Sequence, residues 1–168
     1  MSTPTDVVVV NAGPLLALDA CNQIELLRHL YARVVVPDIV DGELSSDTGH
    51  PLLQGGLTAA HRTWIEVLAP SSPIKPSLLA QLDDGEASVI SLAIELGAST
   101  VLIDERTARK VAVAEGLTPI GSVGIVLLAK REGLVAEVKP LLHEMQAKGI
   151  WLSRRVINDA ILRAGETP

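Results

Sequence analysis

The chain has 168 residues, 48% of them hydrophobic, and a formal net charge of −6 at pH 7. This length suits a single domain that buries its own core, and the apolar fraction excludes a disordered chain. The negative charge excludes a protein that holds nucleic acid by a broadly basic surface, and two tryptophans and one tyrosine argue against a base-stacking platform.

Cysteine usage and the first residues indicate the cytoplasm. The single cysteine, Cys21, permits no internal disulfide, which suits a reducing compartment. The opening "MSTPTD" lacks the basic segment and apolar core of a signal peptide, and the valine run at 7–10 is far too short to cross a membrane. We expect a cytoplasmic protein with no membrane partner.

Short apolar runs alternate with helical patterns along the first 120 residues. Strands are expected at 6–10, 33–37, 64–68, 99–103 and 117–120. Apolar spacing predicts helices that include 15–18, 24–30, 39–44, 87–96 and 108–114. The stretches "SSDTGHPLLQGG" (45–56) and "PSSPIKP" (70–76) are expected to be loops. This alternation predicts an α/β fold, a parallel sheet with helices on both faces.

The chain after residue 121 is expected to be wholly helical. Its segments "VGIVLLAKREG", "VKPLLHEMQAKG" and "LSRRVINDAILRAG" each end in a glycine that suits a helix C-terminus. No linker or internal repeat divides the sequence. We therefore expect one domain over residues 1–168.

Polar residues fall near the carboxyl edge of this predicted sheet, where parallel sheets bind ligands. Asn11 follows the first strand, and Asp104 follows the apolar run "VLI". Glu43 lies about two turns into the helix after the second strand, and Glu86 opens the helix that leads to Asp104. Carboxylates that converge repel one another unless a cation neutralises them, and oxygen ligands suit Mg²⁺ or Mn²⁺.

Each of these residues also has a purely structural interpretation. Glu86 would stabilise a helix N-terminus through the macrodipole, and Asp104 would be the N-cap of the following helix. Glu43 would be a solvated helix residue, and Asn11 would support a turn. The spacing alone leaves these alternatives open.

Two arginines are candidates for contacts to a phosphate. Arg106 and Arg109 follow Asp104 within about one helical turn, although they also suit an ordinary solvated face. Other chemistries find less support, because the sequence holds no GxSxG elbow, no phosphate-binding GxxxxGK[ST] loop and no histidines at metal-ligand spacing. A small-molecule-binding α/β protein therefore ranks last.

Four stretches in sequence order resemble a PIN domain: "VVVVNAGPLLAL", "VVVPDIVDGEL", "LDDGEASVISLAIELGASTVLIDERTARKVA" and "GSVGIVLLAKREGL". The likeness covers nearly the whole chain and is closest to a prokaryotic branch with a "GEA…LIDE" pattern. The resemblance implies a five-stranded parallel sheet in the order 3-2-1-4-5, flanked by helices. It also implies a Mg²⁺- or Mn²⁺-dependent ribonuclease, and many such proteins are toxins of toxin–antitoxin pairs.

Residue roles follow from the same resemblance. Glu43, Glu86 and Asp104 match the family's second, third and fourth acids, and Asn11 stands where the family has its first aspartate. The amide keeps one oxygen ligand but removes a negative charge from the expected metal site.

We therefore expect an endoribonuclease of weakened activity, with RNA as substrate. The alternative is a catalytically inactive PIN-like module that binds RNA or an antitoxin protein. The high apolar content and the amphipathic helices near both ends of the chain also favour an antitoxin partner or a homodimer.

Overall fold

The sheet is parallel, and its strands stand in the order that the resemblance implies. The computed structural model describes residues 6–46 and 56–168. One sheet has the order β3-β2-β1-β4-β5, and Val8 of the central strand pairs with Val34 on one side and Thr100 on the other. The strands are β1 (Val7–Val10), β2 (Arg33–Pro37), β3 (Ile65–Leu68), β4 (Thr100–Leu102) and β5 (Thr118–Ile120). The expected α/β fold is confirmed.

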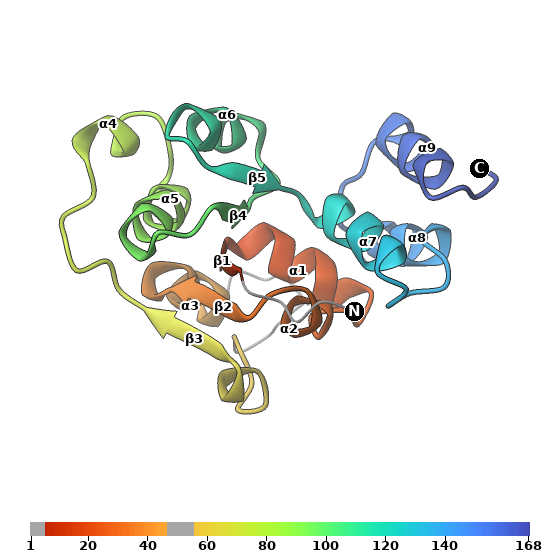
Figure 1. The fold of residues 1–168 in the computed structure, drawn as a ribbon, viewed down its shortest axis with the longest axis horizontal. Coiled ribbons are helices and arrows are strands. Elements are labelled where there is room, and N and C mark those ends of the chain that lie inside the picture. Colours follow the sequence, from red (N-terminus) through yellow and green to blue (C-terminus); the bar gives the residue numbers. More distant parts are fainter. Residues whose placement is uncertain (1–5, 47–55) are drawn as a thin grey trace.

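Helices cover both faces of this sheet. In Figure 1, α3 and α5 lie on one side of the strands, and α1, α2 and α7 lie on the other. The helices are α1 (Ala12–Ala20), α2 (Leu26–Leu30), α3 (Asp38–Ser45), α4 (Pro76–Leu79), α5 (Asp84–Leu96), α6 (Arg106–Ala114), α7 (Ser122–Arg131), α8 (Lys139–Ala147) and α9 (Arg154–Arg163), with a 3-10 helix η1 (His61–Thr63).

The middle of the sheet consists of valines that are buried on both faces. Val8, Val9 and Val10 of β1 have no exposed surface, and neither do Val35 and Val36 of β2. Helices on both faces leave no side of a central strand open to water, so apolar residues fill successive positions instead of alternating with polar ones. A short β-branched run therefore forms the centre of the fold.

The C-terminal helices end at the predicted glycines. Gly133, Gly149 and Gly165 all have positive φ, at 74°, 92° and 74°. After α7, the N–H of Leu134 donates to the carbonyl of Ala129 at 2.8 Å, the closing bond of a Schellman motif. Figure 1 shows α7, α8 and α9 gathered at one end of the molecule.

Two short helical elements were not predicted. The helix α4 begins at the end of the proline-rich stretch, where Pro76 takes a first-turn position that needs no N–H donor. The 3-10 helix η1 precedes β3. Neither element is long enough to produce an apolar periodicity. The loop expected at 45–56 lies mostly outside the described residues.

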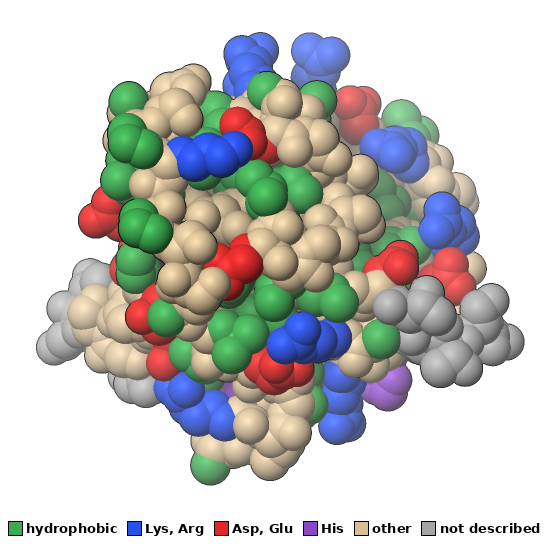
Figure 2. Space-filling model, turned by 60° about the vertical axis from the view of Figure 1, so that its left-hand side comes forward, with side chains coloured by type: hydrophobic (Ala, Val, Ile, Leu, Met, Phe, Trp, Pro, Cys, Tyr) green, Lys and Arg blue, Asp and Glu red, His purple; other side chains and the backbone are tan. Residues whose placement is uncertain are grey.

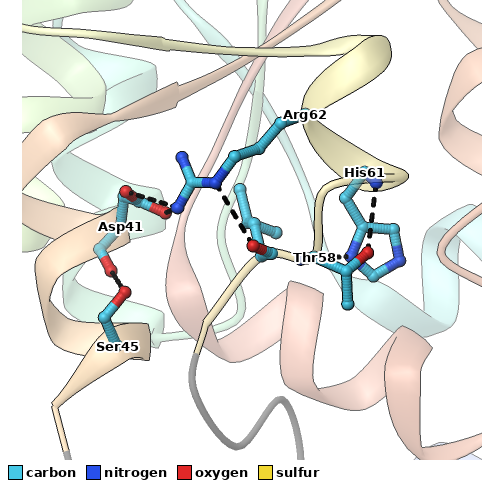
Figure 3. Close-up of polar contacts among 6 residues, drawn as sticks. Asp41, Ser45, Thr58, His61 and Arg62 are labelled. Atoms are coloured by element: carbon cyan, nitrogen blue, oxygen red, sulfur yellow. Dashed lines mark hydrogen bonds and ion pairs between the residues drawn. The ribbon is translucent and has the colours of Figure 1, made fainter.

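An ion pair holds the segment before β3 against α3. Figure 3 shows Arg62 of η1 reaching Asp41, and its Nη2 donates to both carboxylate oxygens at 2.8 and 3.0 Å. The Nε of the same arginine donates to the carbonyl of Leu57 at 3.2 Å. Asp41 stands two residues before Glu43, so this contact steadies the helix that carries one candidate ligand.

The outside of the molecule mixes charges of both signs. On the face in Figure 2, acidic and basic side chains are interspersed with hydrophobic patches. That face offers no broad basic field to a phosphate backbone. Over residues 6–46 and 56–168, no helix has the length and apolar content to cross a membrane.

Candidate active site

Asn11 lies at the carboxyl edge of the sheet, between β1 and α1. Its N–H donates to the carbonyl of Leu102, the last residue of β4, at 3.0 Å. The backbone is extended (φ −85°, ψ 167°), as at a helix N-cap, but in the described structure the side chain makes no capping bond. The residue instead lines a cleft together with Asp104. No side-chain bond therefore supports the interpretation of Asn11 as a turn support.

Asp104 follows β4 and is held by the start of α7. Its Oδ1 accepts hydrogen bonds from the backbone N–H of Ser122 at 2.7 Å and from the Ser122 hydroxyl at 3.1 Å. The N-cap of α6 is the next residue, Glu105, whose side chain accepts from the N–H of Ala108 at 2.8 Å. The interpretation of Asp104 as the N-cap of α6 is therefore wrong, because its carboxylate bonds to the start of α7 and Glu105 caps α6.

The surroundings of Asp104 disfavour its ionised form. Asp104 as a residue is exposed to the cleft, but the groups packed around its carboxylate exclude water from it and raise the pKa of Asp104 above its ordinary value of 3.8. The Ser122 bonds and the Arg109 charge oppose this only in part. The Nη1 of Arg109 donates to the carbonyl of Ile103 at 3.1 Å. A Cβ at Gly121 would lie 2.8 Å from Oδ1 of Asp104 and 2.9 Å from Nη1 of Arg109. The glycine thus leaves room for both charged groups.

Glu86 is buried at the first turn of α5. Its N–H donates to Oδ1 of Asp83 at 2.7 Å, and its own Oε2 accepts from the N–H of Asp83 at 3.3 Å. These two bonds form a capping box. Glu86 therefore does stabilise the N-terminus of its helix, as its structural interpretation predicted. Burial, followed by the charge of Asp83 and the smaller effects of Glu105 and Glu43, raises the pKa of Glu86. The capping residue is therefore also an acid in a negative environment.

Glu43 projects from α3 toward the start of α5. A Cβ added at Gly85 would lie 2.7 and 2.9 Å from the two carboxylate oxygens of Glu43. The residue is exposed, but partial burial of its carboxylate, and then the charges of Asp83 and Asp84, raise the pKa of Glu43. Glu43 is thus more than a solvated helix residue, because its carboxylate lies against the α5 N-terminus.

The predicted residues come together as two pairs. Glu43 and Glu86 are close enough for the charge of one to raise the pKa of the other, whereas Asn11 and Asp104 line the cleft. Glu105 connects the pairs, since it lines the cleft and its charge also acts on Glu86. Within residues 6–46 and 56–168, no three His, Cys, Asp or Glu side chains are gathered closely enough to hold a metal ion.

The donor chemistry nevertheless suits a hard divalent cation. Glu43, Glu86 and Asp104 offer only oxygen atoms, and burial raises the pKa of each. A cation relieves the cost of ionising carboxylates in such surroundings. The chemical character of the set fits Mg²⁺ or Mn²⁺, although the side chains stand in separate pairs.

The structure separates the two candidate arginines. Arg109 lines the cleft beside Asp104, but Arg106, the first residue of α6, is exposed and does not line it. Two further polar residues of the site, Glu105 and Ser122, are not among those that the sequence predicted. Glu105 is the second acid of "LIDE", and Ser122 begins the helix after β5, so a search for polar residues at every strand end would have found both.

Comparison with known proteins gives one family. No curated protein matches the chain. The model of one protein family, DUF3368, described as a PIN domain, matches residues 7–166. This match spans the strands, both residue pairs and the C-terminal helices. The chain belongs to this family of PIN domains, within a nuclease-like superfamily.

Proposed function

We propose that the protein is a PIN-type, metal-dependent endoribonuclease of the cytoplasm, the toxin of a toxin–antitoxin pair. One observation carries the proposal. The chain is a PIN domain, and three of its acids near the carboxyl edge of the sheet, Glu43, Glu86 and Asp104, each have a pKa that burial raises. Carboxylates kept in such costly surroundings favour a role in binding a cation.

Glu43, Glu86 and Asp104 would hold Mg²⁺ or Mn²⁺, with the Asn11 amide oxygen as a weak fourth ligand. A bound cation supplies a water of lowered pKa and stabilises charge on a phosphate. The chain's own residues orient the ligands: Ser122 fixes Asp104, and the capping box fixes Glu86. The exposed Glu43 is the ligand that can move at least cost to join the two pairs.

Arg109 would contact a phosphate of RNA in the cleft. Its Nη1 is anchored to the carbonyl of Ile103, which leaves the group beside Asp104 and along the cleft wall. A cation bound by acids and an anchored guanidinium let a chain of net charge −6 bind a polyanion. Arg106 is the weaker candidate for the same role, because it does not line the cleft.

Asn11 explains why activity is expected to be low. The resemblance places this neutral amide where the family has an aspartate, so the site lacks one charge that would stabilise the transition state. Loss of one such electrostatic contact commonly costs about a hundred- to a thousand-fold in rate. Asn11→Asp is expected to raise cleavage of structured RNAs in Mn²⁺, and Asp104→Asn or Glu86→Gln in that background is expected to abolish it.

Calorimetric titration with Mn²⁺ provides a test that does not depend on the RNA chosen. Three carboxylates and a neutral amide predict weak binding by the chain with Asn11 and tighter binding by Asn11→Asp. Equal affinity of both chains would argue against Asn11 as a ligand. A folded aspartate variant that stays inert on every RNA tried would overturn the nuclease proposal.

A catalytically inactive module that binds RNA or an antitoxin is the second candidate. It is favoured by the neutral Asn11 and by the separation of the acids into two pairs within the described residues. Asparagine at this position throughout close relatives would support it. Exposed apolar side chains, including Val113, Val156 and Leu162, also suit an antitoxin contact or a homodimer. A monomer mass by light scattering at high concentration would remove the homodimer.

A further inference from the structure

The cleft that begins at Asp104 continues onto the C-terminal helices. Besides Asn11, Asp104 and Arg109, its wall includes Trp151 from the α8–α9 connection and Arg163 near the end of α9. Its volume is about 1470 Å³, above the roughly 300–1,000 Å³ of small-molecule pockets. A space of this size and open shape suits an extended polymer.

Basic side chains outnumber acidic ones along this cleft, in contrast to the chain as a whole. Arg109, Lys130, Arg131 and Arg163 line it, against Asp104 and Glu105. The Nζ of Lys130 is already paired with Glu166 at 3.0 Å, and Arg131 contacts Glu132 at 3.4 Å.

Arg163 is exposed and forms no ion pair with any described residue. It therefore remains available to an anionic group in the cleft.

Trp151 is presented to solvent by a well-anchored connection. Its neighbours Ile150 and Leu152 pack against the core, whereas Trp151 itself is 86% exposed. The N–H of Ile150 donates to the carbonyl of Met145 at 3.0 Å, and the side chain of Gln146 donates to the carbonyl of Leu152 at 3.0 Å. A large apolar ring left outside the core, on backbone fixed at both sides, is available for stacking.

We propose that Trp151 stacks on a base of single-stranded RNA while Arg163, at the other end of α9, contacts a phosphate further along the same strand, so that the C-terminal helices position the substrate beside Asp104. This inference rests on the proposed nuclease function and names its substrate class. Stacking requires an unstacked base, so the surface selects single strands over duplexes. A platform of several aromatic residues is not needed, because one exposed ring before α9 and the unpaired Arg163 at its C-terminal end supply a stacking contact and a phosphate contact at two points of the same cleft.

Binding measured without cleavage tests the inference. The chain has two tryptophans, so Trp64→Phe leaves Trp151 as the single reporter. Titration with a short single-stranded oligouridylate in EDTA is expected to quench its emission. A duplex of the same length is expected to quench it far less.

Substitutions then separate stacking from charge. Measured instead by the anisotropy of an end-labelled oligouridylate, Trp151→Ala is expected to weaken binding by roughly 5- to 150-fold, and Trp151→Phe is expected to restore most of it. Arg163→Gln is expected to weaken binding and to reduce the salt slope by about 0.7. Arg155→Gln is the matched control, since Arg155 is exposed on the same helix but does not line the cleft.

The outcomes distinguish this inference from the nuclease proposal. Quenching with tight RNA binding but no cleavage by Asn11→Asp would support the RNA surface and count against the nuclease. A different result would overturn the RNA surface but leave the nuclease proposal standing. In that case RNA does not quench Trp151, and Asn11→Asp cleaves RNA equally well with and without Trp151→Ala. Equal affinity for duplex and single-stranded RNA would overturn the RNA surface. Quenching of Trp151 by an acidic amphipathic peptide, with no effect of RNA, would also overturn it and would favour a protein partner.

Discussion

Oδ1 of Asp104 accepts a hydrogen bond of 2.7 Å from the backbone N–H of Ser122, the first residue of α7. This bond joins the carboxyl end of β4 to the helix that follows β5. It places the acid at a helix N-terminus, whose partial positive charge favours a carboxylate. Asp104 is therefore positioned by the end of β4 and by the first residue of α7, and not by a bond to the first turn of α6.

Removal of the Ser122 hydroxyl is expected to change both stability and the titration of Asp104. Ser122→Ala loses the 3.1 Å bond but keeps the backbone bond, so we expect a loss of about 1–3 kcal/mol in the free energy of unfolding. The pKa of Asp104 is expected to rise further, because one bond to the ionised form is gone. Urea unfolding and NMR titration of the Asp104 carboxyl measure these effects.

Ser88→Ala is the matched control for that experiment. Ser88 is fully buried, and its hydroxyl donates to the carbonyl of Gly85 at 2.7 Å, in a different helix. This variant is expected to lose stability as well but to leave the titration of Asp104 unchanged. An identical pKa of Asp104 in Ser122→Ala and in the natural chain would show that the hydroxyl does not act on the acid.

Neutralising Glu86 is expected to stabilise the protein at neutral pH. Its pKa is raised in the fold from an ordinary 4.5, so the folded chain binds more protons than the unfolded chain just above pH 4.5. Ionisation therefore costs stability as the pH rises through that window. Glu86→Gln keeps the capping box, so we expect it to exceed the natural chain in unfolding free energy at pH 7 and to match it below pH 4.5.

A second variant, Glu66→Gln, is expected to change the free energy of unfolding at pH 7 in the opposite direction. Glu66 forms a double hydrogen bond with Arg33 at 2.7 Å, which lowers the pKa of Glu66. The ionised form of Glu66 therefore stabilises the fold at pH values above the ordinary glutamate pKa of 4.5. That contribution is lost as the pH falls through the lowered pKa. Glu66→Gln is expected to lose stability at pH 7. A Glu86→Gln variant that behaves like Glu66→Gln in urea unfolding would contradict the burial argument.

The architecture was largely predictable from local patterns. The valine runs in β1 and β2 have no competing helical period, so both strands lie within one residue of their expected bounds. The expected strand at 99–103 shortens to Thr100–Leu102, because strand ends depend on pairing partners that sequence spacing does not contain. The strand order came from resemblance and not from periodicity.

The places of the candidate residues in the fold were predictable from the sequence, but their grouping was not, and their role stays a prediction. The sequence predicts that Asn11 and Asp104 lie at the carboxyl edge of the sheet, because both directly follow central parallel strands. Glu43 and Glu86 stand on helices, and their side chains meet through helix packing, which no local pattern encodes. The capping box also holds the Glu86 side chain at the first turn of its own helix. Two pairs in place of one cluster follow from those constraints.

The contact between Arg62 and Asp41 is expected to contribute modestly. Their side chains are 42% and 17% exposed, so solvent screens the pair despite its two hydrogen bonds. A double-mutant cycle with Arg62→Ala and Asp41→Ala is expected to give a coupling of about 0.2–1 kcal/mol in urea unfolding. The cycle for the more exposed pair of Arg33 and Glu66 serves for comparison. A coupling near zero would mean that the contact does not steady α3.

Gly85→Ala is expected to weaken metal binding without unfolding the protein. The new Cβ would lie 2.7 and 2.9 Å from the carboxylate oxygens of Glu43, so that flexible side chain must shift away from the start of α5. Stability is expected to stay level or to rise by up to about 1 kcal/mol, because alanine is the better helix residue. Calorimetry in the Asn11→Asp background is expected to show weaker Mn²⁺ binding.

The control for this change lies one residue from the ligand itself. A Cβ at Gly42 meets nothing within 4 Å, so Gly42→Ala alters the helix of Glu43 but leaves its carboxylate in place. That variant is expected to bind Mn²⁺ as the Asn11→Asp parent does. If Gly85→Ala also binds as tightly as the parent and remains folded, the contact between α3 and the α5 N-terminus does not serve the metal. Glu43 would then be a helix residue that lies near the site only because α3 packs against α5.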